Sequence, residues 1–117
     1  MKKSITLLFL FFILHAGAQE KSKIITSSIT VKGNCESCKK RIENAAEIKG
    51  VKFAEWNAET KTLKVTYRND KVSLEKIVAA ILQSGHDTES EAAPSAAYNK
   101  LPGCCKFRTT QCTEKKD

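Results

Sequence analysis

Residues 24–46 decide the fold, and they read IITSSITVKGNCESCKKRIENAA. Apolar and polar side chains alternate along residues 24–31, which is typical of a half-buried β-strand. The Gly33-Asn34 pair breaks this strand. The apolar residues that follow recur at helical spacing, so a helix is predicted from about Ser37. Cys35 and Cys38 therefore lie on a loop where a strand ends and a helix begins.

The rest of the chain continues this alternation of elements. Residues 51–58 and 63–67 are predicted as two strands of a hairpin, with Trp56 in the core. A second helix begins after Ser73 and ends at Gly85, and a last short strand covers about residues 86–91. This order predicts an α+β fold, a ferredoxin-like βαββαβ sandwich whose antiparallel sheet carries both helices on one face.

The first 18 residues have the layout of a secretory signal peptide. Two lysines precede an apolar run, and Ala16-Gly17-Ala18 forms a small-residue cleavage site. The apolar run is shorter than the ~20 residues that span a bilayer, and no cysteine follows the cleavage site to carry a lipid. We therefore expect a periplasmic or secreted protein with no membrane anchor after cleavage.

Three segments follow from these patterns. Residues 1–18 are the signal peptide, 19–91 form the folded domain, and 92–117 are a linker and a tail. The linker is expected at residues 92–97 from its Ala, Pro and Ser content. The tail carries apolar residues that a fully solvated segment would lack, so it could fold back on the domain.

The C-x-x-C pair limits the chemistry to soft-metal binding or thiol–disulfide exchange. A helix N-terminus favours thiolates, and Lys39, Lys40 and Arg41 are expected to add positive potential. Two thiolates on a loop leave one side of a bound ion open, whereas structural zinc normally takes four protein ligands.

With this motif at a strand end inside a βαββαβ pattern, the chain resembles the heavy-metal-associated domain family. That family includes small copper chaperones, domains of copper-transporting ATPases and periplasmic mercury-binding proteins. The resemblance covers roughly residues 23–91, and other matching positions are Gly50-Val51, Thr60-Lys61 and Gly85. It implies that Cys35 and Cys38 bind the metal, most simply Cu(I), with Hg(II) or Zn(II) as alternatives. A metal-transporting membrane protein or another metal acceptor is the implied partner.

The chain departs from the family pattern at two positions. Gly33 stands where the family usually has a Met that packs beneath the loop, so a looser or differently shaped loop is expected. His86 stands where Tyr or Lys is frequent, close to the metal loop. We weigh His86 as an additional metal ligand against a surface or strand-edge histidine.

Cys104, Cys105 and Cys112 lie outside the family pattern. They could add thiolates to the first site, form a second site or make disulfides. Thiol–disulfide oxidoreductase and structural zinc module remain the alternatives. The first is disfavoured because Gly33-Asn34 replaces the usual aromatic residue and no Pro lies within the domain.

Composition excludes other classes. The chain carries a formal charge of +7, but its basic residues are scattered and are not interleaved with aromatic residues, so nucleic-acid binding is not expected. No Ser/His/Asp set, paired-carboxylate cleft or phosphate loop is present to support catalysis. The sequence thus predicts a monomeric, non-enzymatic protein that sequesters or transfers a soft metal ion.

Overall fold

The computed structural model describes residues 23–109. The elements follow in the order strand, helix, strand, strand, helix, and two short helices close the described chain. Their bounds are β1 (Ile24–Thr30), α1 (Glu36–Ala46), β2 (Val51–Asn57), β3 (Thr62–Arg68), α2 (Leu74–Gln83), α3 (Ser95–Asn99) and the 3₁₀-helix η1 (Gly103–Cys105). None of the helices in this range is long and apolar enough to cross a bilayer.

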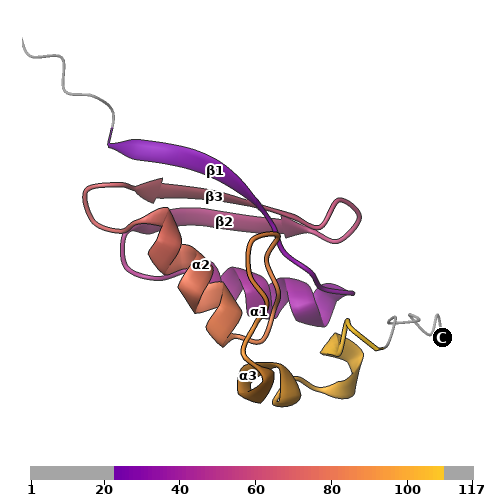
Figure 1. The fold of residues 1–117 in the computed structure, drawn as a ribbon. Coiled ribbons are helices and arrows are strands. Elements are labelled where there is room, and N and C mark those ends of the chain that lie inside the picture. The colour runs from indigo at the N-terminus through magenta and orange to yellow at the C-terminus, as the bar shows by residue number, and fades with distance from the viewer. Residues whose placement is uncertain (1–22, 110–117) are drawn as a thin grey trace, which may run out of the picture.

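The three strands form an antiparallel sheet in the order β1-β3-β2. Figure 1 shows α1 and α2 side by side against one face of this sheet. Alternate residues of β3, such as Leu63 and Val65, are fully buried, as the period of two in the sequence requires. The predicted ferredoxin-like α+β architecture is confirmed.

The predicted last strand, residues 86–91, is reduced to a single bridge between Val31 and Thr88. The side chains of this segment bond its own backbone and turn the chain back. Thr88 Oγ1 accepts from the N–H of Glu91 at 3.3 Å, and Asp87 Oδ1 accepts from the N–H of Ala93 at 2.7 Å. Such local bonds compete with a strand ladder. The segment therefore pairs with the chain at the end of β1 only around this bridge, where the Lys32 N–H donates to the carbonyl oxygen of Asp87 at 2.8 Å and the Glu89 N–H to that of Thr30 at 3.1 Å.

The two main helices end differently from one another. Ser73 Oγ caps α2 by accepting from the N–H of Lys76, as predicted, and Gly85 follows its end with a φ of +97°. Helix α1 ends at Ala46, four residues before Gly50. Gly50 instead takes a positive φ in the turn that enters β2, a conformation that favours glycine.

The C-terminal segment packs on the domain through buried side chains. The predicted linker, residues 92–97, contains the start of α3. In and just after this stretch, Ala93, Tyr98 and Leu101 are all buried. The approach is close at Gly85, where a Cβ atom would lie 2.8 Å from the carbonyl oxygen of Ala97. Figure 1 shows the chain continuing from α3 to η1 beside the first turn of α1. The predicted signal peptide, residues 1–18, and Cys112 lie outside the described residues.

An ion pair fixes the end of this segment. Arg108 donates to both carboxylate oxygens of Asp87, at 2.6 and 3.1 Å, and to the carbonyl oxygen of Ala93 at 3.2 Å. Burial acts to raise the pKa of Asp87, but the bonds from Arg108 and from the Ala93 N–H outweigh it and hold the pKa below its ordinary value. The carboxylate therefore stays charged through the neutral range.

We expect Arg108→Ala to destabilise the protein by about 1–3 kcal/mol, because it leaves a mostly buried carboxylate without its charged donor. Hydrogen exchange should rise first at the amides of η1. The matched control is Arg68→Ala, which removes an equally bidentate but more exposed and local pair with Asp70 and should cost less than about 1 kcal/mol. Equal losses in the two variants, measured by urea unfolding, would contradict this role of Arg108.

Candidate metal centre

Cys35 and Cys38 bracket the first turn of α1. Cys35 is the N-cap residue with an extended backbone, and its carbonyl oxygen accepts from the N–H of Lys39 at 2.9 Å. The first N–H groups of a helix lack intrahelical acceptors and favour nearby negative charge. Cys35 is half-buried, whereas Cys38 is fully buried. The motif thus places one thiol at the surface and the other inside, both at the N-terminal end of α1.

Trp56 packs against the backbone of the loop that carries Cys35, on the side of the core. Its indole is 1% exposed, and its Nε1 donates to the carbonyl oxygen of Val31 at 3.0 Å. A Cβ atom on Gly33 would lie 3.1 Å from the six-membered ring of Trp56 and 3.0 Å from Cβ of Cys38. Trp56 therefore fills the space beneath a loop that was expected to be looser without the Met, and Gly33 leaves room for the indole.

Because this contact is already tight, Gly33→Ala is expected to destabilise the protein by about 1–3 kcal/mol. The added methyl must displace the indole or the Cys38 side chain. Gly103→Ala is the matched control, since a Cβ atom there meets nothing within 4 Å, and its effect should stay within about 0.5 kcal/mol. Thermal melting of both variants checks this. Unchanged stability of Gly33→Ala would mean that the loop is loosely packed.

The basic residues near the thiols have distinct partners. Lys39 pairs with Glu43 and donates to the carbonyl oxygen of Trp56 at 2.9 Å, so its charge ties α1 to β2. Lys61 donates to the carbonyl oxygen of Gly33 at 2.7 Å and lies 5.5 Å from the ring centre of Trp56. Sequence reasoning placed Lys61 only in the hairpin turn. That turn lies at the same end of the sheet as the metal loop, which is the signal that could have found it.

The tail brings two further cysteines to Cys38. Cys105 is fully buried in the same core cluster as Cys38, and its sulfur lies 4.0 Å from that of Cys104. Asn34 of the loop also donates from Nδ2 to the carbonyl oxygen of Cys104 at 3.4 Å. Burial, with these neighbouring thiols, raises the pKa of Cys105 well above its ordinary value. No disulfide joins the four cysteines within residues 23–109.

His86 is buried and does not join the thiols. Its Nδ1 donates to the carbonyl oxygen of Lys32 at 2.8 Å, and its ring stacks on Phe107 with 5.4 Å between centroids. Burial lowers the pKa of His86; the bond to Lys32 opposes this, and Arg41 adds to it. The imidazole is thus neutral at pH 7, and its Nε2 is buried without a hydrogen-bond partner among residues 23–109. The surface position weighed for His86 is wrong, and its role as a ligand stays a prediction.

The described cysteines and histidine do not form a ready-made multidentate site. Within residues 23–109, no three or more His, Cys, Asp or Glu side chains are gathered closely enough to hold a metal ion. The structure places Cys105 beside Cys104 and in one core cluster with Cys38. Cys35 packs against this cluster. The arrangement can offer two or three soft sulfur ligands once an ion draws them together.

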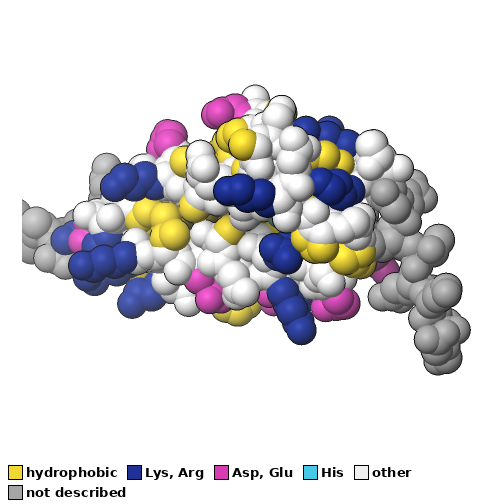
Figure 2. Space-filling model, turned by 90° about the horizontal axis from the view of Figure 1, so that it is seen from below, with side chains coloured by type: hydrophobic (Ala, Val, Ile, Leu, Met, Phe, Trp, Pro, Cys, Tyr) yellow, Lys and Arg dark blue, Asp and Glu magenta, His cyan; other side chains and the backbone are white. Residues whose placement is uncertain are grey.

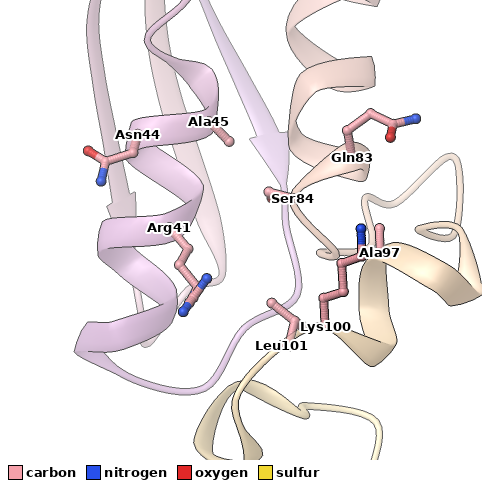
Figure 3. Close-up of a pocket in the computed structure, with 8 residues that line it drawn as sticks. All are labelled: Arg41, Asn44, Ala45, Gln83, Ser84, Ala97, Lys100 and Leu101. Carbon is pink, nitrogen blue, oxygen red and sulfur yellow. The ribbon is translucent and has the colours of Figure 1, made fainter.

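A separate pocket lies on the helical face. It measures about 490 Å³ and lies between α1, the end of α2 and α3. Figure 3 shows Arg41 of α1 and Lys100, which follows α3, at its two sides. Figure 2 shows Lys and Arg side chains spread singly over this face, with acidic side chains among them. No cysteine or histidine lines the pocket, so it is not part of the metal loop.

The fold and the C-x-x-C loop together define a small ferredoxin-like metal-binding domain. The family model for the heavy-metal-associated domain matches residues 28–87, and the chain belongs to this family. This match contains Cys35, Cys38 and His86 but ends before Cys104 and Cys105.

Two relatives are copper chaperones by name, and one similar solved structure is a metallochaperone by name. The copper chaperone CopZ of Staphylococcus epidermidis is 36% identical over 63 residues, which are 52% of this chain and 93% of that protein. The copper chaperone CopZ of Staphylococcus saprophyticus is 35% identical over 66 residues, 55% of this chain and 97% of that protein. The structure of a CopZ metallochaperone superposes with a TM-score of 0.53 at 32% identity, covering 55% of this chain and 98% of that one. These comparisons support a metal-binding role of the chaperone type.

Proposed function

We propose that this chain is an exported protein that binds a soft metal ion, first of all Cu(I), on Cys35 and Cys38. The observation that carries the proposal is the position of the two thiols, on either side of the first turn of α1. Sulfur ligands select soft ions such as Cu(I) over hard ones. The helix N-terminus offsets part of the negative charge that two thiolates leave on a monovalent ion.

The proposed task is to sequester the ion or to pass it to an acceptor. Its relatives carry the name of copper chaperones, which supports transfer. The acceptor we propose is a metal-transporting membrane protein or another metal-binding protein, met by a monomer of this chain. The proposal includes no catalytic step.

Export is proposed from residues 1–18, which have the charge, apolar run and small-residue site of a signal peptide. The protein would then act in the periplasm or outside the cell. The thiols must be kept reduced or metal-loaded there, because such compartments are oxidising. Recovery from cells of a chain that still begins at Met1 would contradict export.

The test is a titration of the reduced protein, without residues 1–18, with Cu(I), Zn(II) and Hg(II) against a competing chelator. We expect one Cu(I) per chain, bound more tightly than Zn(II). Protons should be released as the thiols become thiolate ligands. The proposal would be overturned if the protein failed to compete with the chelator for any of the three ions. A disulfide reductase assay on the same protein checks the alternative chemistry, and turnover there would favour an oxidoreductase.

A further inference from the structure

The C-terminal segment covers the metal loop, although it lies outside the part of the chain that matches the family. Helix η1 packs against α1, and Asn34 of the loop donates to the carbonyl oxygen of Cys104. The segment thus meets the loop through both backbone and side chains. A two-thiolate loop that is open on one side would leave its ion facing solvent or an acceptor, and here a further segment packs beside the loop.

The occupying group is itself a soft ligand. Cys105 is fully buried in the same core cluster as Cys38, which is also fully buried. Cys104, its neighbour, is exposed. The Cys105 thiol thus has no access to solvent. It lies in the same cluster as the Cys38 thiol and is positioned for an ion that Cys38 binds.

The position of Cys105 is fixed from both sides along the chain. Before it, Leu101 is buried and packs at Gly85. After it, the Phe107 ring stacks on His86 and meets Tyr98 edge-on, and Arg108 pairs with Asp87. These contacts need no metal, so the entropy of bringing a distant cysteine to the loop is lost on folding and not on binding.

We propose that Cys105 is a third sulfur ligand of the soft ion that Cys35 and Cys38 bind. This inference rests on the proposed function and names a ligand from the tail. The ion replaces the protons of three thiols, which pass to solvent, and neither sulfur nor metal changes its oxidation state. Cys35 lies three residues before Cys38, and the ion must draw the three sulfurs together, because no three such side chains are gathered within residues 23–109.

Two consequences separate this site from an open two-thiolate loop. The ion is shielded by η1, so its release requires the C-terminal segment to move. The affinity is also higher, because the third ligand is held in place before the ion arrives. The chain is therefore built to retain its ion for longer than a two-cysteine domain would.

X-ray absorption spectroscopy on the reduced, Cu(I)-loaded chain counts the sulfur ligands directly. We expect three sulfurs in the parent chain and in Cys104→Ser, and two in Cys105→Ser. Competition with a chelator should show that Cys105→Ser binds Cu(I) at least about tenfold more weakly than the parent chain. Removing even a group that only supports a metal ligand typically lowers the metal affinity by this factor. Circular dichroism of the apo variants confirms that each is folded.

The outcomes distinguish this inference from the proposed function. Two sulfurs in the parent chain, or a third sulfur that persists in Cys105→Ser, would overturn the assignment while metal binding by the loop stands. Loss of the third sulfur in Cys104→Ser alone would assign the ligand to Cys104 and overturn it equally. A parent chain that binds no Cu(I) would instead overturn the proposed function.

Discussion

A Cys35→Ser/Cys38→Ser variant is expected to lose at least about 100-fold in Cu(I) affinity, because even supporting groups of a metal site cost 10–100-fold and these are the proposed ligands themselves. A hydroxyl is a hard, neutral ligand, whereas the ion requires a soft thiolate. The helix N-terminus remains in the variant, so the loss isolates the sulfur ligands from the electrostatic contribution. Chelator competition measures it.

The control for this variant lies inside the same motif. Ser37→Ala changes an exposed side chain between the two cysteines and should leave the affinity unchanged. Because Cys38 is fully buried, its replacement by serine buries a hydroxyl, and melting of the apo variants must show that the fold survives. A folded double variant that binds Cu(I) as tightly as the parent would remove the loop from the proposed function.

Trp56→Ala is expected to destabilise the protein by about 3–5 kcal/mol, the usual cost of removing a buried indole. The change empties the space beneath Gly33 and leaves the carbonyl oxygen of Val31 without its donor. A domain of this size has a free energy of unfolding of about 5–15 kcal/mol, so a large part of its stability depends on this one side chain. Urea unfolding of the reduced apo protein measures the loss.

Phe53→Ala is the matched control on the same strand. Phe53 is 51% exposed, and its removal should cost less than about 1 kcal/mol. Trp56→Phe fills much of the space but cannot donate to Val31, so an intermediate loss of about 1–2 kcal/mol is expected. Equal losses for Trp56→Ala and Phe53→Ala would mean that the loop does not depend on the indole.

Local patterns were sufficient to predict the central elements. The alternation along β1 and β3 and the helical spacing in α1 and α2 reflect one buried face each, and Ser73 and Gly85 act by local backbone chemistry. The last strand could not be predicted in this way. Residues 86–91 contain Asp and Glu, which are depleted in strands, and the side chains of Asp87 and Thr88 bond the backbone a few residues further on.

The candidate site was only half visible in the sequence. Spacing alone joins Cys35 to Cys38, because they share one turn. Cys38 and Cys105 are far apart in the sequence, and their packing in one core cluster depends on how α3 packs against Gly85, which no local pattern encodes. His86 was weighed as a metal ligand against a surface or strand-edge residue, and the tail that buries it includes Phe107 from a distant part of the sequence.

The indole beneath the loop gives the protein its own optical probe. Trp56 is the only tryptophan of the chain, and its ring lies against the backbone of the loop that carries both motif cysteines. Its emission therefore comes from a single site, free of contributions from other indoles. Any rearrangement of the loop around an arriving ion would change the surroundings of that ring. Loading and unloading could thus be followed in real time by intrinsic fluorescence, without attaching a dye.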